Sequence, residues 1–328
     1  MQLHKVLVTV LLLFIGYNII EVLGRESVSN TAENPLITVE ELKQLMKTTP
    51  VKLIDATYSG KPLPAALQRT NTYGQFDTLE KMLTEDDYKR EHIPGAVPVS
   101  LDVALFHSQY KRFELYPPEI FEKYLRKLGI NNGDRVVVYG REQFSGMLFA
   151  AHIWWLLKYY GVKNARVLNG GIEAWKRNGN PVTSEIAPVQ TGNFTATVNR
   201  KYVITFEELE ERNPRTGALI DHLNTENVFD SRPREQYSGA VKMNYNSPVE
   251  LKGSHIEGAK NLPAVNLVNE KVLAEAGYIP GKPVITYCSV GNQGSLDLLA
   301  LRSVGIDNIK LYQGGMTEMA LRDPKRIS

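Results

Sequence analysis

The 328-residue sequence is poor in cysteine, with Cys288 alone, and this scarcity excludes two common kinds of site. A single thiol can form neither an intramolecular disulfide nor a cysteine-based zinc site. Charge of one sign is also scarce, because 38 basic residues against 36 acidic ones leave a net charge of +2. This balance gives no reason to expect a nucleic acid or a strongly acidic partner.

The remaining composition is that of a globular protein. Hydrophobic residues make up 43% of the chain and charged residues 23%, which is ordinary for a folded domain. The length suggests two domains, with enough chain to bury a core in each.

The amino end has the layout of an export signal. A short basic start, residues 1–5, precedes an apolar run over residues 6–15, and Gly24 offers a site for cleavage. This pattern predicts a signal peptide over residues 1–24. The alternative is an uncleaved signal anchor, because apolar residues continue to Ile20. In either case we expect a secreted protein or one of the secretory pathway, without stable membrane association if the signal is cleaved. Asn193 begins a glycosylation acceptor pattern.

The chain is organised around Cys288. Residues 284–287 are typical of a short buried strand, residues 289–294 of a polar, glycine-containing loop, and residues 296–301 of the start of a helix. A sulfur at such a junction faces backbone N–H groups and the amino end of a helix, which stabilise the thiolate, the nucleophilic form of cysteine. The alternative is that Cys288 is a small buried hydrophobic residue.

Strands and helices alternate along the chain, and the pattern occurs twice. Alternation of this kind predicts an α/β fold in which each domain is a parallel sheet with helices on both faces. Five landmarks repeat in the same order, which indicates a tandem duplication. We expect a first domain over residues 36–186, a linker over residues 187–201 and a second domain over residues 202–328. The paired landmarks are the opening helices at residues 38–46 and 205–211, the acid-ended strands at Asp55 and Asp230, the turns at His92 and His255, the central strands at residues 135–139 and 283–287, and the Gly-Gly turns at Gly171 and Gly315.

The two halves differ where the cysteine stands. Gly140 occupies the position of Cys288 in the first half and is followed by Arg141. Only the second half can therefore perform cysteine chemistry, and the first is expected to shape or cover the site.

At these residues the chain resembles the two-domain rhodanese family, the thiosulfate and 3-mercaptopyruvate sulfurtransferases. The resemblance covers nearly everything after the export segment. It implies tandem rhodanese-like domains and a sulfur that cycles between thiolate and persulfide on Cys288. It also implies a six-residue loop that continues through Ser289, Val290, Gly291, Asn292 and Gln293. Neither a metal nor an organic cofactor is implied; the partners are a small anionic sulfur donor and an acceptor that is a small-molecule or protein thiol, or cyanide.

The loop departs from the family pattern. Ser289 and Val290 are neutral where thiosulfate sulfurtransferases have basic residues, and only Cys288 and Gly291 match the Cys-Gly-Ser-Gly-Val-Thr of mercaptopyruvate enzymes. Val290 replaces the loop serine and cannot relay a proton. The neutral loop favours 3-mercaptopyruvate over thiosulfate as the donor.

Residues outside the loop also depart from the family. Gln236 stands where the family has a substrate-binding arginine. Asp102 matches the aspartate of the family's first-half proton relay, but the histidine that completes this relay is missing near Phe113. Arg232 and Arg234 are candidates for the positive charge that binds an anionic donor. Arg232 could instead brace its own domain, and Asp102 could be a turn carboxylate.

Two other functions are weighed against sulfur transfer. The family's reactive residues are replaced at Val290, at Gln236 and near Phe113. These replacements suggest a catalytically weak or inactive extracellular binding protein on the same fold. A cysteine phosphatase would need an arginine to close a Cys-x5-Arg loop, and that position is Gly294. His92 and His255 are interpreted as turn residues with satisfied hydrogen bonds.

Overall fold

The computed structural model describes residues 34–60, 72–141, 143–266 and 269–328. The expected signal peptide, residues 1–24, lies outside them. None of the helices formed by these described residues has the length and apolar character needed to cross a membrane. These described residues belong to one compact unit that contains both halves of the repeat.

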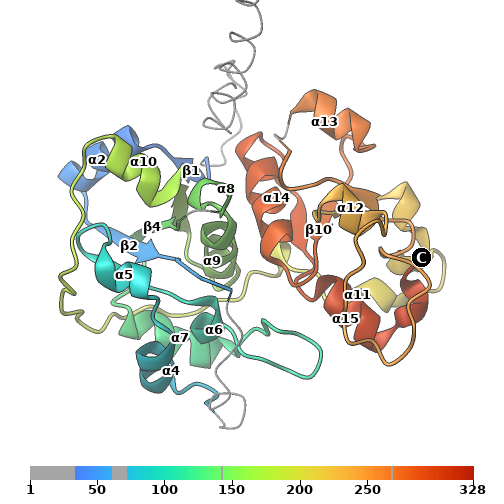
Figure 1. Ribbon diagram of the computed structural model, residues 1–328, viewed down its shortest axis with the longest axis horizontal. Coiled ribbons are helices and arrows are strands. Elements are labelled where there is room, and N and C mark those ends of the chain that lie inside the picture. Colours follow the sequence, from blue (N-terminus) through green and yellow to red (C-terminus); the bar gives the residue numbers. More distant parts are fainter. Residues whose placement is uncertain (1–33, 61–71, 142, 267–268) are drawn as a thin grey trace, which may run out of the picture. The chain divides into compact units, whose positions relative to one another are not determined.

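The first half is built on a five-stranded parallel sheet with the order β1-β5-β4-β2-β3 (Figure 1). Apolar, largely β-branched runs such as that of β4 favour central strands of a parallel sheet, which are buried on both faces. The strands are β1 (Leu36–Ile37), β2 (Val51–Asp55), β3 (Ala96–Pro98), β4 (Arg135–Tyr139) and β5 (Asn164–Leu168).

Helices cover this first sheet. Side chains of α2 and α10 share a core cluster with Leu53, Val137 and Tyr139 of the strands, and α9 packs against β4 and β5. In α9, Trp154 and Trp155 are fully buried, as expected for core residues. The helices are α2 (Val39–Thr48), α4 (Phe76–Leu83), α5 (Asp86–Arg90), α6 (Leu101–Ala104), α7 (Pro118–Lys127), α8 (Gln143–Gly146), α9 (Leu148–Tyr159) and α10 (Gly171–Arg177).

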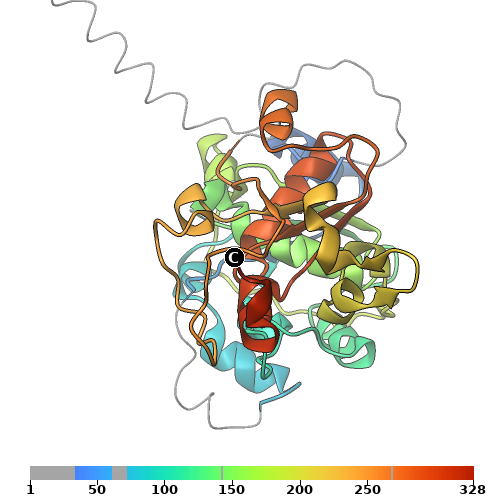
Figure 2. The same cartoon turned by 90° about the vertical axis from the view of Figure 1, so that its right-hand side faces the viewer.

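The second half is built on a four-stranded parallel sheet with the order β11-β10-β8-β9. Its core cluster includes residues of α11 and α15, while α14 packs against β10 and β11 and against α9 of the first half (Figures 1 and 2). The strands are β8 (Asn227–Asp230), β9 (Lys260–Asn261), β10 (Val284–Tyr287) and β11 (Ile309–Leu311), with a separate antiparallel pair, β6 (Arg212–Asn213) and β7 (Gly217–Ala218). The helices are α11 (Phe206–Glu210), α12 (Arg234–Tyr237), α13 (Glu270–Glu275), α14 (Asn292–Ser303) and α15 (Gly315–Arg322), with 3-10 helices η2 (Arg200–Tyr202), η3 (Leu219–Thr225) and η4 (Pro324–Arg326).

The two turns that begin with histidine have the same structure. His92 Nδ1 bonds the Tyr88 carbonyl at 2.8 Å and its ring stacks on Tyr88; His255 Nδ1 bonds the Tyr237 carbonyl at 3.1 Å and stacks on Tyr237. Each tyrosine hydroxyl in turn donates to the carbonyl of the alanine four residues after the histidine, Ala96 in the first half and Ala259 in the second. These contacts confirm the interpretation of both histidines as turn residues.

The Gly-Gly turns bring the start of a helix against the end of the central strand. Ile172 N–H donates to the Gly140 carbonyl at 3.1 Å, and Met316 N–H donates to the Cys288 carbonyl at 2.9 Å. At Gly171 and Gly315 φ is positive, and a Cβ would collide with the carbonyl oxygen of Gly140 or Cys288. Glycine is therefore required at both positions, and the structural equivalence of Gly140 and Cys288 is confirmed.

Candidate active site at Cys288

Cys288 lies where the buried strand β10 gives way to helix α14. The four residues of β10 are buried, and the helix begins at Asn292 after Gly291, whose φ of 96° turns the chain back towards the sulfur. A left-handed turn of this kind suits glycine. The predicted strand and the helix that follows it are confirmed, but the helix begins at Asn292, four residues earlier than expected, so the residues predicted as loop at 292–294 form its first turn.

The sulfur is held by backbone donors but is shielded from water. Gly291 N–H donates to Cys288 Sγ at 3.2 Å, and the side chain is 2% exposed. Burial raises the pKa of the Cys288 thiol above its ordinary value, although N–H groups of Val290, Gln293 and Gly294 lower it in part. The expected loop donors are present, but burial outweighs their effect on the thiol pKa.

The loop is fastened on both sides. Ser289 accepts a hydrogen bond at its carbonyl from Thr317 N–H at 3.1 Å, and its hydroxyl lies 3.3 Å from the Tyr245 hydroxyl. On the helix side, Thr286 Oγ1 donates to the Gly294 carbonyl at 2.8 Å. The described contacts therefore tie the loop to α15, to Tyr245 and to its own preceding strand.

Arg232 is engaged inside its own half. Its side chain is 1% exposed and pairs with Asp230 at 2.5 Å, and Nη1 donates to the Tyr245 hydroxyl at 2.6 Å. Nη2 also donates to the Ser254 carbonyl at 2.8 Å. Through these bonds Arg232 holds Asp230, at the end of β8, and Tyr245, whose hydroxyl contacts Ser289. Of the two roles that the sequence left open for Arg232, these contacts favour the bracing of its own domain.

Arg234 lies in a different setting. It is exposed at the first turn of α12 and forms no ion pair with any residue that the structure describes. Gln236 follows on the same short helix. Arg234 thus stays the candidate of the two arginines for an anionic ligand.

Asp102 is satisfied by residues of the first half. Its carboxylate accepts hydrogen bonds from the Tyr58 hydroxyl at 2.8 Å and from Arg112 Nη2 at 3.1 Å. Burial raises the pKa of Asp102, and the positive charge of Arg112 opposes that rise. Arg112, adjacent in sequence to Phe113, therefore supplies the partner of Asp102, where the resemblance had suggested a histidine.

A histidine that the sequence did not single out reaches the Cys288 loop from the first half. His152 lies on α9, is fully buried, and its Nδ1 lies 2.5 Å from Oδ1 of Asn292. Burial lowers the pKa of His152 to about 4, so the ring is neutral. The sequence holds a signal, because His152 is the polar residue within the buried stretch Leu148–Leu157.

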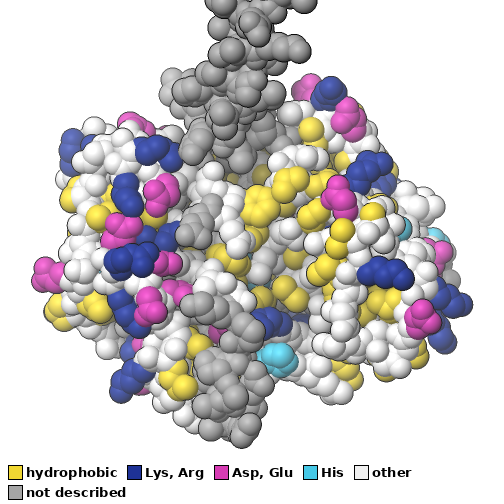
Figure 3. All heavy atoms as spheres, viewed as in Figure 1, with side chains coloured by type: hydrophobic (Ala, Val, Ile, Leu, Met, Phe, Trp, Pro, Cys, Tyr) yellow, Lys and Arg dark blue, Asp and Glu magenta, His cyan; other side chains and the backbone are white. Residues whose placement is uncertain are grey.

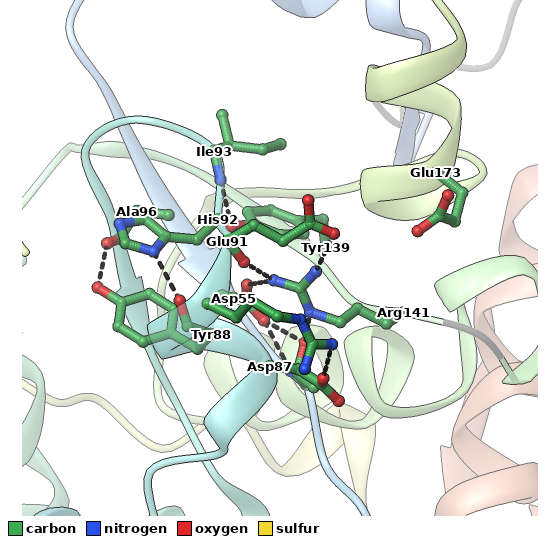
Figure 4. Close-up of polar contacts among 12 residues, drawn as sticks. Asp55, Asp87, Tyr88, Glu91, His92, Ile93, Ala96, Tyr139, Arg141 and Glu173 are labelled. Atoms are coloured by element: carbon green, nitrogen blue, oxygen red, sulfur yellow. Dashed lines mark hydrogen bonds and ion pairs between the residues drawn. The ribbon is translucent and has the colours of Figure 1, made fainter. Parts of the chain in front are cut away.

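The equivalent position of the first half holds an ion pair instead of a nucleophile (Figure 4). Arg141 Nη2 pairs with Asp55 at 2.9 Å and Nε donates to Thr57 Oγ1 at 2.9 Å. Arg141 Nη2 also donates to the Glu91 carbonyl. Asp55 is fully buried, so the first half has a buried ion pair at the place where the second half has Cys288 and its loop.

The described residues form neither a surface patch of one charge on the face seen in Figure 3 nor a cluster of metal ligands. On the face seen in Figure 3, basic and acidic side chains are interspersed over the surface. Within the described ranges there is no group of three or more histidine, cysteine, aspartate or glutamate residues arranged to hold a metal ion.

Comparison with known proteins agrees with this architecture. The model of the Rhodanese-like domain matches residues 38–178 and 216–321. The chain is 35% identical to the "Putative thiosulfate sulfurtransferase mpst-1" of Caenorhabditis elegans over 87% of this chain and 92% of that protein. It is 30% identical to the 3-mercaptopyruvate sulfurtransferase of Escherichia coli strain K12 over 72% of this chain and 83% of that protein.

Among solved structures, SseA from Escherichia coli, described as a 3-mercaptopyruvate sulfotransferase with the rhodanese fold, superposes with a TM-score of 0.66 at 25% identity. The superposition covers 86% of this chain and 99% of that one. The family model matches both halves, and the relatives are named as sulfurtransferases, so the comparisons give both the family and the enzyme class. The chain belongs to the rhodanese family, as a two-domain sulfurtransferase.

Proposed function

We propose that the protein moves a sulfane sulfur from an anionic donor, 3-mercaptopyruvate in preference to thiosulfate, to a thiol or to cyanide through a persulfide on Cys288. The observation that carries this proposal is the position of Sγ, which accepts the Gly291 N–H at the amino end of α14. Backbone donors so placed stabilise negative charge on sulfur as it develops.

The transfer proceeds in two steps, the first with the donor and the second with the acceptor. Cys288 sulfur attacks the sulfur of 3-mercaptopyruvate, an S–S bond forms, the C–S bond breaks, and the electron pair remains on the pyruvate carbon. That carbon takes up the proton that the Cys288 thiol gives up when it becomes the attacking thiolate, and it leaves as pyruvate. An acceptor thiolate then attacks the outer sulfur of the persulfide, takes that sulfur, and releases Cys288 as thiolate.

The neutral loop supports this donor. Ser289 and Val290 add no cation beside the sulfur, whereas the doubly charged thiosulfate would benefit from one.

A mass spectrum of the intact protein after brief exposure to each donor tests the proposal. We expect 3-mercaptopyruvate to add the mass of one sulfur atom, which a thiol then removes, and Cys288→Ser to show no addition. Thiosulfate should give a smaller fraction of modified protein. A Cys288→Ser variant that still transfers sulfur would overturn the assignment.

The burial of Cys288 also favours a second candidate, a binding protein with little or no turnover. A thiol that is 2% exposed with a raised pKa reacts slowly unless the loop opens. This candidate predicts that neither donor modifies Cys288 and that the thiol stays free.

We also propose that the protein is exported, on the basis of the signal pattern over residues 1–24. Expression of the full chain in a eukaryotic secretory host tests it. An amino terminus near residue 25 in the medium supports a cleaved signal, while retention of the full chain in membranes supports the anchor.

A further inference from the structure

We infer that His152 of the first half is a positioning residue for the Cys288 loop of the second half. The inference rests on the proposed role of Cys288 as the nucleophile, and it concerns how the first half takes part although it lacks a cysteine.

The contact between His152 and Asn292 is specific in its atoms. The amide oxygen of Asn292 can only accept a hydrogen bond, so Nδ1 of His152 carries the proton and donates it across 2.5 Å. Nε2 is then left as an acceptor, and it has no hydrogen-bond partner among the residues that the structure describes. A ring held through one nitrogen in this way keeps a fixed tautomer and orientation.

Asn292 is the first residue of α14, directly after the residue that bonds the sulfur. Gly291 donates its N–H to Cys288 Sγ at 3.2 Å. A Cβ placed on Gly291 would lie 3.4 Å from Cε1 of His152 and 3.1 Å from Cγ of Gln313. The imidazole therefore packs against Gly291 and bonds the residue that follows it, so that it fixes the direction of the N–H donor to the sulfur.

The same helix of the first half makes a second contact that serves as a matched control. Trp155 Nε1 donates to the Tyr202 carbonyl at 2.6 Å, at the start of the second half. This bond links the halves as the His152 bond does, but it joins η2 and not the Cys288 loop. The Trp155 ring also meets the His152 ring edge-on, with 5.5 Å between the ring centroids, so the control variant has to keep an aromatic ring at residue 155. With that ring kept, loss of the link between the halves can be separated from loss of loop position.

Three substitutions at residue 152 separate the donor from the volume of the ring. His152→Leu removes the donor. His152→Asn keeps a donor at the place of Nδ1, while His152→Gln moves the donor to the place of Nε2. Trp155→Phe removes the control hydrogen bond and retains an aromatic ring.

The rate of Cys288 alkylation by iodoacetamide, measured against pH, is the readout, because it reports the thiol pKa without any sulfur donor. We expect His152→Leu and His152→Gln to slow alkylation at pH 7 about tenfold, which corresponds to a rise of one pKa unit. His152→Asn should restore most of the rate, and Trp155→Phe should leave the profile unchanged. Asn292→Ala should slow alkylation as His152→Leu does, and the double variant should be no slower than either.

Unchanged alkylation profiles in all three residue-152 variants, with only the melting temperature lowered, would overturn the inference and leave His152 as a core residue. The outcome is independent of the proposed function. If the unaltered protein gains no sulfur from either donor, sulfur transfer fails, while the alkylation profiles still decide whether His152 positions the loop.

Discussion

Gly315 lies so close to Cys288 that a Cβ on Gly315 would fall on the carbonyl oxygen of the cysteine. The backbone at Gly315 has a φ of 53°, and the following N–H, of Met316, donates to that same carbonyl. The start of α15 thereby fixes the peptide that carries the reactive side chain. A change at this contact is therefore expected to affect both the stability of the fold and the reactivity of Cys288.

Gly315→Ala should therefore displace the Cys288 loop as well as lower stability. Left-handed backbone alone costs a non-glycine residue about 1–2 kcal/mol, and the collision adds to it. Gly305→Ala is the matched control, because Gly305 has a φ of 89° and open space around its Cβ position. Gly315→Ala should lower the free energy of unfolding in urea and the yield of persulfide on Cys288 more than Gly305→Ala does. Equal effects of the two variants would contradict the argument.

Arg232→Met should destabilise the second half and alter the thiol. It leaves the fully buried Asp230 without its ion pair, and an uncompensated buried charge costs about 3–5 kcal/mol. Asp230 also raises the pKa of Cys288, an effect that grows once its counter-ion is gone. Urea unfolding and the pH profile of alkylation measure the two effects. Arg234→Met, at an exposed position, should stay within about 0.5 kcal/mol of the unaltered protein.

Arg141→Met should show the stability loss without the effect on the thiol. The Arg141–Asp55 pair is buried, so its loss should also cost about 3–5 kcal/mol. All its described polar partners belong to the first half, so alkylation of Cys288 should keep its rate under conditions where the variant is folded. A slowed alkylation would show that the first-half ion pair acts on the loop.

The arrangement around Cys288 could be predicted from the sequence because its determinants are local. A buried strand, a glycine at the left-handed position and a following helix are set by neighbouring residues. The repeat supplies a second copy of each landmark, so the sequence alone aligns Gly140 with Cys288. The same reasoning interpreted His92 and His255 correctly.

The partners of the charged and polar side chains could not be predicted in the same way. Arg232 was considered for substrate contact, yet its guanidinium bonds residues up to 22 positions away. In the sequence His152 is one polar residue within an apolar helix, and its partner Asn292 is 140 residues distant. The Arg232 contacts depend on how the second half folds around its strand end, and the His152–Asn292 pair depends on the packing of α9 against α14; no local pattern encodes either.

The burial of His152 makes a distinct contribution to the pH dependence of stability. Its pKa is about 4 in the folded protein, below the ordinary 6.5. Between these values the unfolded chain binds a proton that the folded protein does not, so stability is lost as the pH falls. From pH 7.5 to 5 the loss should be about 2 kcal/mol. His152→Asn, which has no titrating group there, should lack this part of the slope. Urea unfolding of both proteins at each pH isolates the contribution by difference, and parallel curves would mean that His152 titrates normally in the folded state.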